Sequence, residues 1–129
     1  MVRVYRFPVI TTVGEDGSAT GTATTEHPIV GEIKSIHVDY ANQPATTDVT
    51  IATTHAPVLT ILTLTDNNTD GWIHPRHILQ DAVGAALTFD GTNEVYGCIY
   101  VNDYVKVTVA EGDGAGGDET VAVTLVYED

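Results

Sequence analysis

The sequence is poor in cysteine, in positive charge and in aromatic residues. It holds one cysteine, Cys98, so an internal disulfide framework is excluded. Cys98 lies in an apolar run and is expected to be a small buried residue. Five lysines and arginines stand against 18 acidic residues, and the formal net charge is −13. Because phosphate binding needs a basic surface, direct nucleic-acid binding is not expected, and anionic membranes are equally unsuitable partners.

Long apolar runs and catalytic motifs are also missing. No run approaches the roughly 18 apolar residues of a membrane span, and the N-terminus alternates instead of forming a signal-peptide core. We therefore expect a soluble, unprocessed chain. The sequence contains no Gly-x-Ser-x-Gly elbow and no phosphate-binding glycine loop before a helix. Its paired carboxylates lie in glycine-rich turns, so the chain is not expected to be an enzyme.

The sequence is rich in threonine and valine, two residues that favour strands. A period of two places Ile36, Val38 and Tyr40 on one face and His37 and Asp39 on the other. A second alternation, from residue 104 to 110, turns its valines inward and Lys106 and Thr108 outward. The pattern predicts a single all-β domain over residues 1–129, an antiparallel β-sandwich or jelly roll of about eight strands.

Three segments carry more specific expectations. Residues 18–25 are rich in threonine and predict an edge strand or a solvated strand. Residues 72–81 predict an irregular loop with short strand pieces, because Pro75 and Gly84 limit any helix. The last two strands, joined by a flexible acidic loop at residues 111–119, are expected to form a hairpin.

The kind of acidity is informative as well. Lys34 and Lys106 are the only lysines, and aspartate outnumbers glutamate. Many short carboxylates with few lysines are typical of proteins that work in concentrated salt, where self-repulsion is screened within about 3 Å at 1 M. An ordinary acidic surface at moderate salt remains the alternative.

One motif suggests a metal. The segment from Asp66 to Gly71 matches the first six positions of a calcium loop, in which Asp66, Asn68 and Asp70 would supply oxygen ligands. The bidentate acid of the twelfth position is missing, because His77 stands there. A turn rich in aspartate and asparagine explains the same residues without an ion. We therefore expect no cofactor and keep calcium as the alternative.

Strand and turn patterns over most of the chain also support a resemblance, carried by residues 4–13, 31–40, 43–51, 72–76 and 105–109. In these segments the chain resembles small β-sandwich proteins encoded near the head genes of tailed double-stranded-DNA viruses, namely capsid decoration or cement proteins. The resemblance implies a homotrimer bound to the major capsid protein on the outer capsid surface of the virion. It implies no catalytic residues.

The resemblance also suggests a contact. Arg3, Tyr5 and Arg6 place rare cations on the first strand, and we expect this strand to reach a neighbouring subunit. Pairing of these arginines with local acids is the alternative. Strand patterns alone do not separate a decoration protein from a turret base, neck or tail protein. A calcium-dependent carbohydrate-binding sandwich, using the Asp66 turn and Trp72, is a further alternative.

Overall fold

The computed structural model describes all 129 residues, and its regular elements are all strands, with no helix. The chain therefore has no helical segment that could cross a membrane. The strands, in chain order, are β1 (Val2–Arg6), β2 (Ile10–Thr11), β3 (Ala19–Thr24), β4 (Ile29–Ala41), β5 (Asp48–Thr53), β6 (Thr60–Leu64), β7 (Gly71–Ile73), β8 (Arg76–Ile78), β9 (Tyr96–Asp103), β10 (Val105–Gly112) and β11 (Thr120–Glu128).

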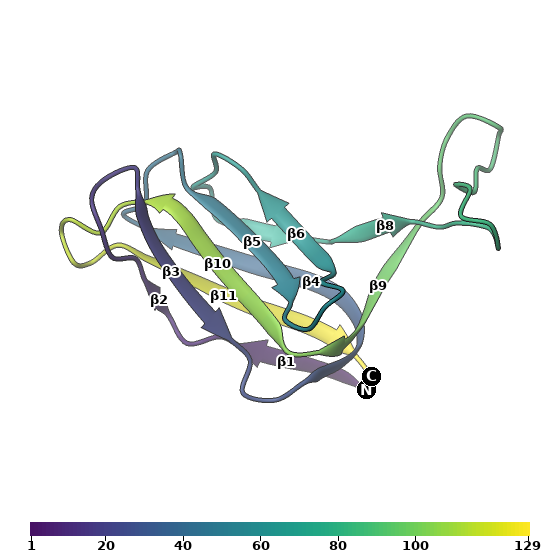
Figure 1. The fold of residues 1–129 in the computed structure, drawn as a ribbon, viewed down its shortest axis with the longest axis horizontal. Coiled ribbons are helices and arrows are strands. Elements are labelled where there is room, and N and C mark those ends of the chain that lie inside the picture. Colours follow the sequence, from purple (N-terminus) through teal and green to yellow (C-terminus); the bar gives the residue numbers. More distant parts are fainter.

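Two antiparallel sheets pack face to face (Figure 1). The seven-stranded sheet has the order β1-β11-β4-β9-β8, with β2 paired to β11 and β7 paired to β4. The four-stranded sheet has the order β3-β10-β5-β6. This arrangement confirms the predicted all-β antiparallel sandwich. It also confirms that residues 18–25 form an edge strand, because β3 ends the smaller sheet.

One hydrophobic core of 19 buried residues lies between the sheets. The long strand β4 contributes Ile36 and Val38, which are fully buried, and Tyr40, which is 8% exposed. Asp39 points to solvent and His37 is half-buried on the outer face. The predicted faces of this strand are therefore confirmed. They arise because successive side chains of a strand point to opposite sides of its sheet.

Strands number eleven, not about eight. The three additional strands are short: β2 has two residues, and β7 and β8 have three each. A period of two cannot be recognised in segments of this length. Two of them, β7 and β8, are the short strand pieces expected within residues 72–81.

The predicted hairpin of the last two strands is wrong. β10 buries its valines as predicted, but it pairs with β3 and β5 in the smaller sheet. β11 pairs with β1, β2 and β4 in the larger sheet. Alternation fixes which face of a strand is buried but not which strand lies beside it. Both strands face the same core from opposite sheets, so the acidic loop crosses between the sheets.

This crossing loop is anchored by buried polar groups. Glu119 is 4% exposed, and the backbone N–H of Asp118 donates to its carboxylate at 3.1 Å. The side chain of Gln43 accepts from the backbone N–H of Asp113 at 3.1 Å and donates to Thr12 Oγ1 at 2.9 Å. Because buried polar groups need partners, these bonds hold the loop in place. These bonds tie both ends of the loop to the sandwich, and the flexibility of the loop stays a prediction.

Candidate functional site

A shallow hollow lies on the outer face of the seven-stranded sheet. Its volume is about 270 Å³, and its lining residues come from four neighbouring strands: Val4, Arg6, His37, Trp72, Thr124 and Val126. The pairing register explains why they meet. Arg6 lies opposite Thr124, Thr124 opposite His37, and His37 opposite Trp72, so one row of side chains crosses the sheet. Side chains directly opposite one another on the same face of a sheet are in contact distance.

The hollow combines apolar surface with positive charge. Trp72 is 56% exposed and Val4 is 49% exposed. The Trp72 ring lies edge-on to the His37 ring, with 5.0 Å between centroids, which fixes one wall. Arg6 forms no ion pair within the chain, unlike Arg3. The hollow is therefore suited to an apolar or aromatic side chain with a carboxylate beside it.

A projecting arm, residues 79–95, is the second candidate. It extends from β8 and β9 away from the sandwich (Figure 1). The side chain of Leu79 covers Gly97 at its root, where an added Cβ would lie 2.7 Å from Leu79 Cδ2. Every hydrogen bond formed by the arm joins it to itself or to Tyr96. The arm is thus ordered without resting on the sandwich.

Two turns shape the arm. The carboxylate of Asp81 accepts from the backbone N–H groups of Val83 and Ala85, at 2.9 and 3.0 Å. The carboxylate of Asp90 accepts from those of Thr92 and Asn93, at 2.9 and 2.6 Å. These bonds lower the pKa of Asp90, because they stabilise its charged form. Side chains that bond to backbone N–H groups two or three residues ahead are typical of aspartate turns.

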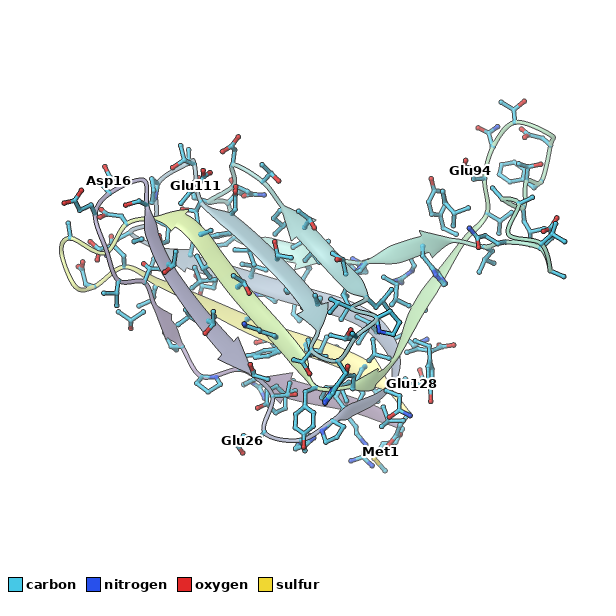
Figure 2. All side chains as sticks on the ribbon, in the orientation of Figure 1. Met1, Asp16, Glu26, Glu94, Glu111 and Glu128 are labelled. Atoms are coloured by element: carbon cyan, nitrogen blue, oxygen red, sulfur yellow. The ribbon has the colours of Figure 1, made fainter.

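The arm exposes apolar side chains. Val83 is 88% exposed, Phe89 is 73% exposed and Leu87 is 41% exposed. Figure 2 shows the side chains of this region, with Glu94 labelled, standing clear of the sandwich. The arm also carries three carboxylates, Asp81, Asp90 and Glu94, and no cation. Sequence reasoning missed this feature, because apolar residues in an uninterpreted segment do not reveal whether they are buried.

The predicted partner residues of β1 lie in different surroundings. Arg3 Nε donates to Asp129 Oδ2 at 2.6 Å, and this hydrogen bond raises the pKa of Arg3. The Tyr5 ring lies 5.0 Å from that of Phe7, and its hydroxyl accepts from the backbone N–H of Glu26 at 3.1 Å. Arg6 alone faces the hollow. Local pairing, the alternative for the arginines, therefore holds for Arg3 and not for Arg6.

The predicted calcium ligands are also separated. Asn68 Nδ2 donates to the carbonyl of Gln43 at 2.9 Å, and Asp70 Oδ1 accepts from the backbone N–H of Tyr40 at 2.7 Å. Asn68 thus connects the turn to the loop after β4, and Asp70 connects it to β4 itself. The pKa of Tyr40 is raised to about 12, mainly by burial of its hydroxyl and to a smaller extent by the charge of Asp70.

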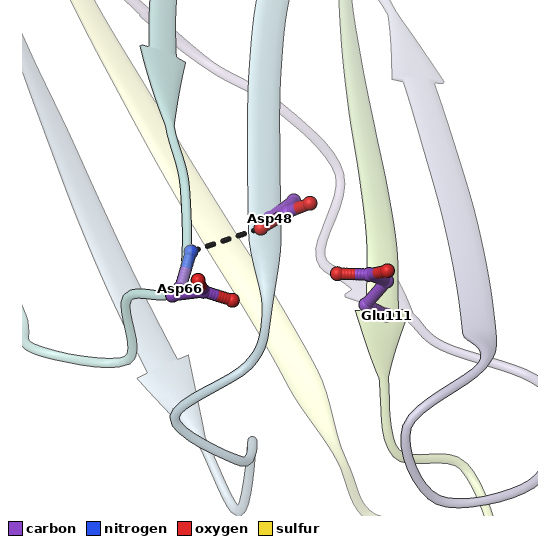
Figure 3. Close-up of side chains that lie close together, drawn as sticks. All are labelled: Asp48, Asp66 and Glu111. Carbon is purple, nitrogen blue, oxygen red and sulfur yellow. Dashed lines mark hydrogen bonds between the residues drawn. The ribbon is translucent and has the colours of Figure 1, made fainter.

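Asp66 belongs to a different group, with Asp48 and Glu111 (Figure 3). Potential ligand oxygens of these three residues lie within 4.8 Å of one another. The carboxylate of Asp48 also accepts from the backbone N–H of Asp66 at 2.9 Å. Strand pairing brings the group together, because Asp48 starts β5 opposite Ala110 of β10, and Glu111 is the next residue of β10. Oxygen ligands of this kind suit a hard cation such as calcium.

A second hollow of about 280 Å³ lies where β9 turns into β10 and the chain passes between sheets. Here His55 Nδ1 lies 2.6 Å from Asp103 Oδ1, and the backbone N–H of His55 donates to Asp103 at 2.9 Å. Hydrogen bonds from the His55 side chain and backbone lower the pKa of Asp103 to about 2. The lining is mainly polar and includes Pro28, Asn102 and Tyr104. This arrangement secures a crossing between the two sheets.

Cys98 is half-buried, in contrast to the fully buried position expected. Its sulfur lies 4.0 Å from Lys34 Nζ. Lys34 also donates to Glu32 at 2.9 Å, and that hydrogen bond raises the pKa of the lysine. The ammonium group is thus shared with a carboxylate on its own strand.

Comparison with known families and proteins adds no assignment. No protein-family model matches the chain, and no curated protein matches it. The function of the chain is therefore inferred from the geometry of the hollow and the arm.

Proposed function

We propose that this chain is a structural virion protein that decorates the outer surface of a viral capsid and binds the major capsid protein. One observation carries this proposal: the fold leaves apolar side chains exposed on a projecting arm and in a hollow on the sheet. Apolar patches of this kind are typical of interaction sites. The resemblance to cement proteins of tailed double-stranded-DNA viruses supplies the partner, and it also suggests a homotrimer. The proposed role is binding, so it assigns no catalytic residue.

The open edge of β1 is the proposed contact with the capsid. β1 pairs with β11 on one side and has no strand on the other. An edge strand presents unpaired N–H and C=O groups, to which an extended segment of a partner can add. This contact develops the expectation that the first strand reaches a neighbouring subunit.

Concentrated salt is the proposed working environment. A net charge of −13 makes copies of the chain repel one another at low ionic strength. Salt screens this repulsion and would favour assembly on a crowded capsid surface. Unfolding and assembly measured at low salt and at about 1 M salt test this part, and identical values at both would contradict it.

Cosedimentation tests the proposed function. Purified chain is mixed with shells of the major capsid protein encoded by the same genome, in about 1 M salt. We expect saturable binding to the shells. Thr24→Pro offers a matched control, because it alters β3, the corresponding edge of the smaller sheet, whereas Val2→Pro alters the β1 edge without touching the hollow. Loss of binding in the Val2 variant alone supports the β1 contact. Absence of binding by the unaltered chain contradicts capsid decoration and favours a turret base, neck or tail protein.

A calcium-dependent carbohydrate-binding module is the second candidate. The group of Asp48, Asp66 and Glu111 favours it, because it supplies three carboxylates at one point. Trp72 would have to stack on the sugar, yet it lies on the other sheet. Calorimetric titration with calcium, followed by a glycan-binding screen with and without calcium, distinguishes this candidate. Calcium-dependent glycan binding would replace the capsid proposal.

A further inference from the structure

The arm and the hollow have complementary chemistry, and both belong to one chain. The arm presents Phe89 and Val83 at 73% and 88% exposure, among three carboxylates and no cation. The hollow presents Val4 and Trp72 as apolar walls, with Arg6 at its side. Both surfaces are therefore apolar, and they carry opposite charges.

Charge singles out this hollow among the surfaces of an acidic protein. With 18 acidic residues and five lysines and arginines, most of the surface repels an acidic arm. Three of those five cations, Arg6, Arg76 and Lys106, form no ion pair within the chain, and of these only Arg6 lines a hollow. His37 lies further along the same row of side chains, with Thr124 between it and Arg6. An acidic, apolar segment thus meets less repulsion here, and complementary charge gives a contact its specificity.

Space and reach also agree. A hollow of about 270 Å³ has room for one aromatic ring. The arm stands away from its own sandwich, and its one hydrogen bond to a strand is donated by the Tyr96 hydroxyl at the start of β9 (Figure 1). Its aspartate turns hold it in shape before any contact forms, which lowers the entropic cost of binding. A second copy of the chain is therefore the occupant to which these observations point.

We propose that the arm of one copy, residues 79–95, binds the hollow of a second copy, with Phe89 packed against Trp72 and an arm carboxylate facing Arg6. The contact joins two different patches, so each copy both gives an arm and receives one. Such a head-to-tail contact closes into a ring or continues as a chain of copies. The proposal concerns the purified chain alone and does not depend on a capsid.

Light scattering of the purified chain gives the first test, over a range of concentrations at about 1 M salt, where net repulsion is screened. We expect the mass to rise above that of a monomer. Phe89→Asp should weaken association about 30-fold or more, the loss expected for a central aromatic contact. Val13→Asp is the matched control, because Val13 is 74% exposed and lies outside both surfaces. A monomeric unaltered chain would overturn the proposal, as would equal effects of the two variants.

Mixing two variants gives the decisive test. Trp72→Asp spoils the hollow and keeps the arm, whereas Phe89→Asp spoils the arm and keeps the hollow. Each variant alone should remain monomeric, with circular dichroism confirming that it is folded. Mixed in equal amounts, they should form a dimer of one copy of each, because one intact arm then meets one intact hollow. If the mixture stays monomeric while both variants are folded, the arm and the hollow do not bind each other, and the proposal fails.

Discussion

The sandwich and the arm of this chain use apolar residues in opposite ways. In the sandwich, β4 and β10 bury alternate side chains in a shared core. In the arm, every residue from Asp81 to Glu94 is exposed, although the segment contains Val83, Leu87 and Phe89. Burial stabilises the first region, whereas aspartate turns and backbone hydrogen bonds order the second. The apolar side chains of the arm contribute little to folding, so they are available to a partner.

The largest expected difference between the regions comes from truncating one apolar residue in each. Ile36 is fully buried, so Ile36→Ala should lower the free energy of unfolding by about 2–5 kcal/mol. Phe89→Ala should change it by less than about 0.5 kcal/mol in dilute solution. Urea unfolding followed by circular dichroism measures both. Similar losses for the two variants would show that the arm packs against the sandwich.

The second comparison replaces one glutamine near the sandwich and one glutamine in the arm. Gln43→Leu removes bonds to Thr12 and Asp113 and leaves the Asp113 N–H unpaired, so we expect a loss of about 1–3 kcal/mol. Gln80→Leu is the matched control, because Gln80 is exposed in the arm, and its effect should stay within about 0.5 kcal/mol. Urea unfolding of the two variants side by side decides whether the buried network anchors the crossing loop.

Acid should weaken one crossing between the sheets of the sandwich. Asp103 has a pKa of about 2, below its ordinary value, so its bonds to His55 stabilise the fold above the unfolded pKa. This contribution should be fully present above about pH 4 and lost as the pH falls towards 2. Asp103→Asn should therefore reduce the free energy of unfolding at pH 5 and have little effect near pH 2. An effect that does not vary with pH would contradict this role of Asp103.

Removing the whole arm should have only a small effect on stability. Leu79 N–H donates to the Val95 carbonyl at 2.8 Å, so an Asn-Gly turn in place of residues 80–94 can close the hairpin. We expect a change in the free energy of unfolding within about 0.5–1 kcal/mol, together with complete loss of self-association. Thermal unfolding and light scattering measure the two effects. A large loss of stability would place the arm within the cooperative fold.

The period of two allowed the class of fold and the buried faces to be predicted. Ile36, Val38 and the valines of β10 point inward as their spacing indicates. The partners of each strand could not be predicted, because pairing of β10 with β5 joins residues far apart in the sequence. The prediction that β10 and β11 form a hairpin is wrong for this reason.

The candidate sites were less predictable than the fold. Arg6 is recognisable in the sequence as a rare cation, but its place in one row with Thr124, His37 and Trp72 depends on the register of four strands. Asp66 was expected to join Asn68 and Asp70, its neighbours in sequence. It lies instead beside Asp48 and Glu111, which strand pairing brings from other parts of the chain. The exposure of the arm has no local signal in the sequence, because its cause is the absence of any element packed over it.

The fluorescence of Trp72 tests the binding of arm to hollow most directly. Trp72 is the only tryptophan and is 56% exposed, so its emission reports on the hollow alone. As the concentration of the chain rises at about 1 M salt, we expect the emission to shift to shorter wavelength in step with the increase in mass. The emission of the Phe89→Asp variant should stay at the position of an exposed tryptophan. An increase in mass with no change in Trp72 emission would contradict binding of the arm to the hollow, because the copies would then associate without covering Trp72.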